Sequence, residues 1–221
     1  MFRVLATQLE RAGYAALRFD YSGTGDSLGD SQAATVDAWV GDVAIAADRL
    51  RSASGAARLA VVGLRFGATL ATLAGARGDL RLRHLVLWDP IVDGAAYIRE
   101  LAQQHRVYMR EEIGDGWVDR LELAADGMPV EAIGTPVGQA LGGQIAEIDL
   151  SVTLPAAEQL TVLTTRMTPE LERLRPRLPA WTRWVEMADS PAWNADAALN
   201  AMTVPMDIVR AIVGRIEETC P

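Results

Sequence analysis

Hydrophobic residues follow two patterns along the chain: short continuous runs, and longer stretches in which they recur every three or four positions. The continuous runs predict buried strands, at Leu59–Gly63, His84–Trp88, Leu160–Thr165 and Thr182–Met187. The spaced stretches predict helices with one buried face, at Phe2–Ala12, Thr35–Leu50, Ala68–Ala76, Pro169–Arg175 and Pro205–Glu217. Apolar strands that alternate with helices are typical of a parallel sheet covered on both faces, so the pattern predicts an α/β fold.

Two further segments complete the predicted architecture. Tyr14–Tyr21 predicts another strand, which ends in the glycine-containing turn Ser22–Asp26. Residues 94–150 hold helix-like pieces, irregularly spaced glycines and no convincing strand. We therefore expect a single domain over residues 1–221, with 94–150 inserted between sheet elements as a helical cap.

Composition narrows the function classes. The net charge of −8 argues against nucleic acid or an anionic membrane as the main partner. The chain has no lysine, which excludes a Schiff-base lysine, a phosphate-loop lysine and a Ser-Lys dyad. No segment has the roughly 20 apolar residues of a membrane span, and Met1–Leu9 does not resemble a signal peptide, so we expect a cytoplasmic location. We expect no metal and no cofactor.

The glycine-rich stretch that follows Tyr21 superficially resembles a dinucleotide-binding turn. The stretch Gly23–Gly29 has spacing one residue too long for the dinucleotide fingerprint, and no helix opens directly on it. Asp42 and Asp48, the acidic residues that follow, fall within a predicted helix instead of at a strand end. This stretch therefore gives no support for a dinucleotide cofactor.

The pentapeptide Gly63-Leu64-Arg65-Phe66-Gly67 lies between a predicted strand and a predicted helix. A residue at such a sharp strand-to-helix turn has a strained backbone, and its neighbours two positions away must be small, as both glycines are. A simple tight turn with two glycines is the alternative reading. The arrangement is that of the nucleophile elbow of α/β-hydrolases, in which the central residue is the catalytic nucleophile.

Other segments support the same resemblance over roughly residues 1–100. The turn Asp20-x-x-Gly23-x-Gly25-x-Ser27 and the passage Leu85–Leu101 resemble the corresponding parts of α/β-hydrolases. The block GLRFGATLA beside LWDP resembles hydrolase-like proteins found with bacterial exosortase systems, in which we expect arginine at the elbow. The resemblance implies an α/β-hydrolase fold, with a mostly parallel sheet flanked by helices.

The resemblance also implies a triad of Ser, then Asp or Glu, then His, which this sequence does not supply. The nucleophile position holds Arg65, which stays protonated and cannot attack a carbonyl. Asp89, after the strand His84–Trp88, is a possible acid, or else a turn cap beside Pro90. Glu170 is closer to the usual acid position, but it falls where a helix begins and reads as a first-turn charge.

No histidine follows Met187, where the resemblance places the catalytic one. His84 opens the strand that Asp89 closes, about 16 Å away at 3.3 Å per residue. His105 lies in the predicted cap, where we interpret it as structural. A serine needs a base within hydrogen-bond reach, so the sequence does not support standard hydrolysis.

In α/β-hydrolases, strands precede the first helix, and a loop beside them supplies one N–H group of the oxyanion hole. The sequence has no counterpart of these strands or of that N–H group. The sequence leaves two explanations open: a start codon placed too far downstream, or a reduced sheet. Loss of one such donor costs an esterase roughly 10²–10³ in rate.

Three functions remain open. The chain is first read as a non-catalytic homologue of esterases that binds a small acidic or acyl ligand, or a protein partner, with Leu64, Arg65 and Phe66 as ligand-binding residues. In that reading Arg65 holds an anion; the alternative is that it pairs internally, with Asp89 or Asp20. The second function is an atypical active hydrolase or acyltransferase that uses Asp89 with a cap residue, or Ser27. The third is an interaction or scaffold subunit with a vestigial pocket.

Overall fold

The computed structural model describes residues 1–78, 80–118, 131–132, 135–187 and 204–220. These residues form two compact units. The first consists of residues 1–19, 43–91 and 150–221, and the second of residues 20–42 and 92–149. Each unit is described by itself.

The first unit is built on a four-stranded sheet. Its strands are β1 (Leu59–Leu64), β2 (Leu82–Trp88), β5 (Ala157–Thr164) and β6 (Arg183–Glu186), and they are ordered β1-β2-β5-β6. Every neighbouring pair in this sheet is parallel. The α/β fold and the positions of these four strands are therefore confirmed to within three residues at each end.

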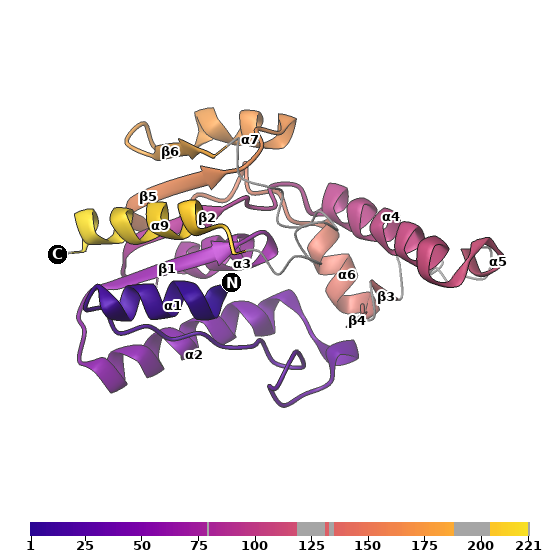
Figure 1. Cartoon of the computed structure of the whole chain (residues 1–221), viewed down its shortest axis with the longest axis horizontal. Helices are drawn as coiled ribbons and strands as arrows, with labels where there is room; N and C mark the ends of the chain where they lie inside the picture. Colours follow the sequence, from indigo (N-terminus) through magenta and orange to yellow (C-terminus); the bar gives the residue numbers. More distant parts are fainter. Residues whose placement is uncertain (79, 119–130, 133–134, 188–203, 221) are drawn as a thin grey trace. The chain divides into compact units, whose positions relative to one another are not determined.

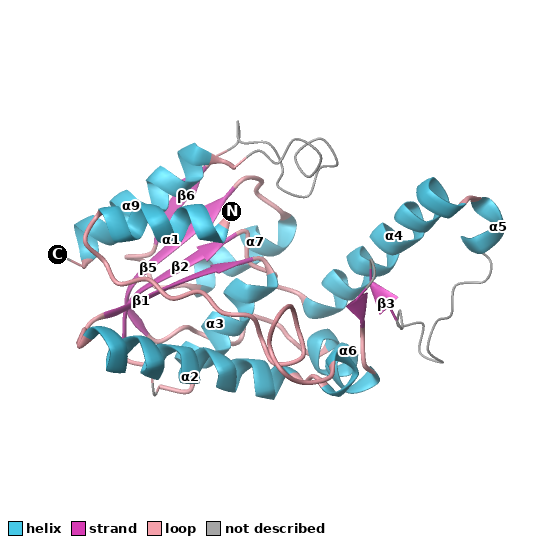
Figure 2. Cartoon of the chain, turned by 60° about the horizontal axis from the view of Figure 1, so that its bottom comes forward, coloured by secondary structure: helices cyan, strands magenta, loops and turns pink. Residues whose placement is uncertain are grey.

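Helices cover both faces of this sheet (Figures 1 and 2). On one face lie α1 (Phe2–Arg11) and α9 (Met206–Thr219), and on the other lies α3 (Phe66–Ala76), which packs against β1 and β2. The core under α9 is apolar, with Val86, Trp88 and Ile212 buried. Because both faces are covered, the strands carry continuous apolar runs, which is why the sequence pattern located them.

The predicted strand at Tyr14–Tyr21 is wrong. Residues 14–21 form neither helix nor strand and belong to none of the described sheets. A strand needs a neighbour whose backbone completes the hydrogen-bond ladder, and no described strand pairs with this segment in a sheet. The sequence pattern shows that the side chains are apolar, but it does not show whether another strand lies beside the segment.

The second unit is mainly helical. It contains η1 (Ser31–Ala33), the start of α2 (Val36–Ser54), α4 (Gly94–Ile113), α5 (Asp115–Val118) and α6 (Gln139–Ala146). A Cβ added to Gly94 would lie 1.7 Å from the Ile145 carbonyl oxygen, so only glycine permits the close contact of α4 with α6. A short antiparallel pair, β3 (Glu131–Ala132) with β4 (Thr135–Pro136), is the one departure from the strand-free prediction in the described part of this unit.

The remaining short elements belong to the first unit. They are α7 (Pro169–Leu174), which begins at the cap residue Thr168, and the single turn η2 (Arg175–Arg177). That residues 94–150 act as a cap stays a prediction.

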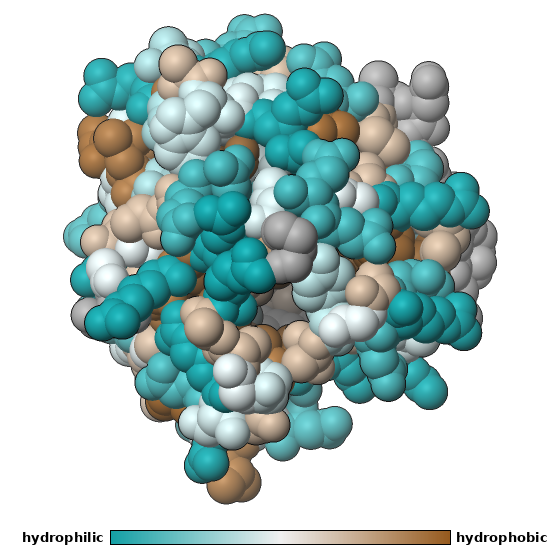
Figure 3. Space-filling model, turned by 90° about the vertical axis from the view of Figure 1, so that its left-hand side faces the viewer, coloured by the Kyte–Doolittle hydropathy of each residue, from teal (hydrophilic) through white to brown (hydrophobic). Residues whose placement is uncertain are grey.

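β1 begins on one side of the first unit, and the surface on that side is mostly hydrophilic. Figure 3 shows that side, on which apolar residues form separate patches between charged and polar ones. In the described part of the chain, no helix is long and apolar enough to span a membrane.

Candidate functional site

The turn from β1 into α3 has the geometry of a nucleophile elbow. Arg65, between the two elements, has φ 52° and ψ −122°, a backbone conformation that non-glycine residues rarely adopt. A Cβ added to Gly63 would lie 2.4 Å from the Ala68 Cα and 2.6 Å from the Ala68 nitrogen. Only glycine fits at position 63 because the first turn of α3 passes directly over the end of β1.

Asp89 occupies the matching position on the adjacent strand. Leu64 and Trp88 are partners in the parallel ladder, so Arg65 and Asp89 each follow a paired residue. Asp89 also has a positive φ, 42°. The Arg65 N–H donates to the Trp88 carbonyl at 2.9 Å, and the Asp89 N–H donates to the Leu163 carbonyl at 2.9 Å. The two strained residues therefore lie side by side at the carboxyl edge of the sheet.

The Asp89 carboxylate is buried and held by the end of β5. Its Oδ1 accepts from the Thr165 N–H at 2.8 Å, and its Oδ2 accepts from the Thr165 hydroxyl at 2.8 Å. The Thr164 hydroxyl lies 3.0 Å from Oδ1 and 2.7 Å from the Arg166 carbonyl oxygen, so its one proton is shared between two acceptors. These donors fix the orientation of the carboxylate.

Thr164 and Thr165 were not singled out from the sequence. The sequence does contain a hint of their role, because these two hydroxyl residues end a strand that is predicted to be parallel to the strand before Asp89. Without the strand order, however, nothing in the sequence placed β5 next to β2 instead of elsewhere in the sheet.

The side chains at the elbow are partly exposed. Leu64, Arg65 and Phe66 are all of intermediate burial, and the Arg65 Nε atom lies inside the protein. The guanidinium is protonated at any relevant pH, so it cannot act as a nucleophile or a base. It can hold a carboxylate or phosphate through two parallel hydrogen bonds.

His84 lies at the other end of β2 and is fully buried. Its Nδ1 is 2.7 Å from the Thr219 hydroxyl oxygen, and its Nε2 is 2.9 Å from that of Thr161. Because the Thr219 hydroxyl donates to the Arg215 carbonyl, its oxygen is left to accept from Nδ1–H, and Nε2 then accepts from Thr161. The ring is therefore the neutral Nδ1–H tautomer, with both nitrogens engaged.

The environment of His84 also disfavours its charged form. Burial, and then the positive charges of Arg215 and Arg83, lower the pKa of His84 to about 4. His105, the other histidine, is buried on α4 in the second unit.

The remaining sequence candidates serve local structure. The Ser27 hydroxyl donates to the Asp20 carbonyl at 2.6 Å, and the Asp20 carboxylate accepts from the Asp26 N–H at 3.2 Å. Both contacts close the glycine-containing turn. Glu170 lies in the first turn of α7, as predicted. Among the residues whose placement is described, no group of three or more His, Cys, Asp or Glu side chains is arranged to hold a metal ion.

A parallel sheet with helices on both faces and a sharp strand–elbow–helix turn define an α/β-hydrolase fold. More narrowly, the chain belongs to the serine aminopeptidase S33 family, whose model matches residues 1–120. No curated protein matches the chain significantly.

Solved structures of hydrolases share this fold at low sequence identity. A putative hydrolase from Agrobacterium vitis is 18% identical, with a TM-score of 0.59 over 95% of this chain and 81% of that one. A monoacylglycerol lipase from Paleococcus ferrophilus is 16% identical, with a TM-score of 0.60 over 97% and 88%. A thermophilic esterase from Thermogutta terrifontis with malate bound is 18% identical, with a TM-score of 0.57 over 91% and 79%.

Proposed function

We propose that this chain is a non-catalytic member of its hydrolase family that binds a small acidic or acyl ligand at the elbow. The observation that carries the proposal is the backbone of Arg65, which keeps the strained conformation of a nucleophile while its side chain cannot be one. Strain of this kind costs about 1–3 kcal/mol and persists where the surrounding structure enforces it, commonly at functional sites.

The charge at the elbow supports an anionic ligand. Arg65 directly precedes α3, whose first N–H groups and dipole add partial positive charge at the same place. Leu64 and Phe66, the partly buried sequence neighbours of Arg65, are apolar, which suits an acyl carboxylate. The competing reading is that a carboxylate of the protein itself neutralises Arg65 and no ligand binds.

The proposal is tested by thermal shift with formate, acetate, malate, octanoate and inorganic phosphate. We include malate because it is the ligand named for the Thermogutta esterase structure. At a hundredfold excess over Kd, a bound anion should stabilise the protein by about 2.7 kcal/mol and raise the Tm by several degrees. The rise should disappear in Arg65→Ala and persist in Arg77→Ala, which removes the same charge at the other end of α3.

The same panel can defeat the proposal. If no anion raises the Tm of the unaltered protein, or if Arg65→Ala responds equally, the elbow does not bind anions. Arg65 then serves only as an internal partner.

An atypical hydrolase or acyltransferase is the second candidate, and the geometry of Asp89 favours it. Asp89 is oriented by three donors at the end of the strand next to the elbow, as a catalytic acid would be. Against it, His84 is engaged at the other end of β2, and a base must lie within hydrogen-bond reach of its nucleophile. p-Nitrophenyl acetate, butyrate and octanoate test this reading: turnover above background that is lost in Asp89→Asn would establish catalysis and overturn the non-catalytic proposal.

A scaffold subunit with a vestigial pocket is the third candidate. Trp181 is 52% exposed and supplies aromatic surface for a partner. A stable complex on affinity purification that survives Arg65→Ala would favour it. We also propose that the chain belongs to the exosortase-associated branch and is located in the cytoplasm. Cell fractionation tests the location.

A further inference from the structure

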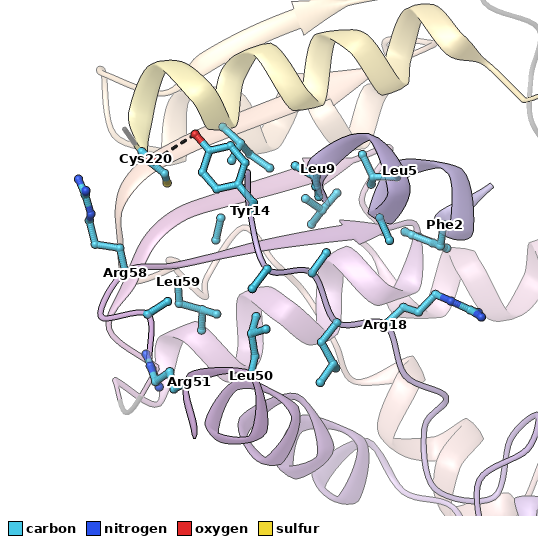
Figure 4. A pocket seen from close by; sticks show the side chains of 18 residues that line it. Phe2, Leu5, Leu9, Tyr14, Arg18, Leu50, Arg51, Arg58, Leu59 and Cys220 are labelled. Carbon is cyan, nitrogen blue, oxygen red and sulfur yellow. Dashed lines mark hydrogen bonds between the residues drawn. The ribbon is translucent and has the colours of Figure 1, made fainter. Parts of the chain in front are cut away.

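Three hydrogen bonds between described residues attach the end of α9 to the rest of the first unit. The His84 Nδ1–H on β2 donates to the Thr219 hydroxyl oxygen at 2.7 Å, and the Arg83 Nε–H donates to the Thr219 carbonyl at 2.8 Å. The Tyr14 hydroxyl donates to the Cys220 carbonyl at 3.1 Å, as Figure 4 shows. The last carbonyls of a helix have no partner within the helix, so these donors from outside α9 satisfy them.

His84 connects three elements at this place. Its Nε2 accepts from the Thr161 hydroxyl at 2.9 Å, so the buried neutral ring joins β2 to β5 as well as to α9. The preceding part of α9 is held differently, because Val209, Ile212 and Ile216 are fully buried in an apolar cluster. The helix is therefore held by apolar packing as far as Ile216 and mainly by polar contacts after it.

The charges around His84 oppose protonation of its ring. Arg83 on β2 pairs with Glu158 of β5, and Arg215 on α9 pairs with Glu218. Both carboxylates thus serve a guanidinium, whereas the two ring nitrogens bond to neutral hydroxyls. Burial, followed by the charges of Arg215 and Arg83, lowers the pKa of His84 to about 4. A protonated ring is therefore more stable in water than in this closed arrangement.

We propose that these contacts form an acid-sensitive latch, in which protonation of His84 releases the end of α9 while the rest of the first unit stays folded. The neutral ring keeps the latch closed. Opening lets water reach the ring, which then binds a proton more readily, so acid shifts the equilibrium toward the open state. Opening also uncovers the thiol of Cys220, which is 8% exposed in the closed state and is the one cysteine in the sequence.

The thiol of Cys220 gives the first test. Its labelling by dithiodipyridine is measured between pH 7 and pH 5, and each rate is divided by that of the urea-unfolded chain at the same pH. This ratio removes the effect of pH on the thiol itself. Uptake of one proton on opening should raise the ratio at least tenfold from pH 7 to pH 5. A ratio that does not change with pH overturns the proposal, and so does a ratio near one at pH 7.

A substitution at His84 identifies the group that senses pH. In His84→Gln the side chain can still form hydrogen bonds but does not titrate, so the ratio should change less than twofold over the same range. His105→Gln is the matched control, because it removes the other buried histidine, in the second unit, and should keep the tenfold rise. An equal rise in His84→Gln and in the unaltered protein overturns the proposal, because another group is then the sensor.

Two further measurements leave His84 in place. Below the unfolding transition, the labelling rate should depend little on urea, because a local opening exposes little surface. A urea dependence equal to that of global unfolding overturns the proposal. Tyr14→Phe removes one of the three hydrogen bonds and should raise the ratio several-fold at every pH, with the tenfold rise in acid retained. An unchanged ratio at pH 7 in this variant contradicts the latch.

Discussion

Strand β2 has a buried polar residue at each end, and the two ends are built on different principles. Near the amino end, His84 lies within the strand, and both of its ring nitrogens contact threonine hydroxyls. Arg81, which precedes the strand, also has a positive φ of 45°, but it is not part of a pair of adjacent strained residues as Arg65 and Asp89 are. At the carboxyl end, Asp89 is also buried and hydrogen-bonded, but its backbone is in the left-handed region, beside a second strained residue, Arg65.

The backbone conformation distinguishes a polar side chain that serves the structure, His84, from one that belongs to a functional site, Asp89. A buried polar side chain needs partners wherever it lies, so satisfied hydrogen bonds alone identify nothing. Backbone strain lowers stability and brings no packing benefit, so two adjacent strained residues point to a function at the carboxyl end. Four predictions test whether the paired strained residues at the carboxyl end of β2 and His84 near its amino end differ as this comparison requires.

The largest effect is expected at Gly63. Gly63→Ala places a Cβ 2.4 Å from the Ala68 Cα and should lower the free energy of unfolding by about 3 kcal/mol or more, since backbone atoms on both sides must move. Gly214→Ala is the control, because Gly214 lies within α9 with no atom near its would-be Cβ. It should stabilise by about 0.5–1 kcal/mol. Urea unfolding measures both; a cost at Gly63 below 1 kcal/mol would mean that the elbow is not tightly constrained.

The next effect concerns Asp89. Asp89→Ala leaves the Thr165 N–H and hydroxyl without their acceptor, while the Thr164 hydroxyl keeps the Arg166 carbonyl, and should cost about 2–3 kcal/mol. Asp89→Asn should cost only about 1 kcal/mol, because asparagine tolerates a positive φ, keeps one oxygen and can donate to the Thr165 hydroxyl. Equal losses in the two variants would contradict the assigned hydrogen bonds.

These contacts also mark where sequence reasoning succeeded and where it stopped. The elbow was predictable because strand, glycines and helix are contiguous, so a local pattern contains the whole motif. The place of His84 was predictable because a strand has a fixed rise per residue. Thr164 and Thr165 were missed because their role depends on strand order, which no local pattern encodes. Tyr14–Tyr21 was assigned wrongly for the same reason: an apolar extended segment has one pattern whether or not a neighbour completes its ladder.

The buried imidazole of His84 should affect how the stability of the protein depends on pH. The pKa of His84 is about 4 in the folded protein, and histidine in an unfolded chain has a pKa of about 6.5. Between these values the unfolded state binds more protons, so the stability present above pH 6.5 is lost as the pH falls toward 4. The contribution to the slope is at most about 1.4 kcal/mol per pH unit.

Urea unfolding of the unaltered protein and of His84→Gln at several pH values between 4 and 7 measures this contribution. Glutamine can still bond to Thr161 and Thr219 but does not titrate, so the slope should become shallower. The same substitution at His105 controls for the loss of a buried imidazole. An unchanged slope in His84→Gln would mean that other groups govern acid unfolding.

The smallest effect isolates the strain itself. Arg65→Ala and Arg65→Gly both remove the guanidinium and all its contacts, so the difference between them reports only the backbone. At φ 52° and ψ −122° glycine is unstrained and alanine is not, so the glycine variant should be more stable by about 1 kcal/mol. At Val62, in the regular part of β1, the order should be reversed, with alanine more stable than glycine. If alanine is the more stable residue at both positions, the elbow stores no strain, and the contrast between the two ends of β2 reduces to their side chains.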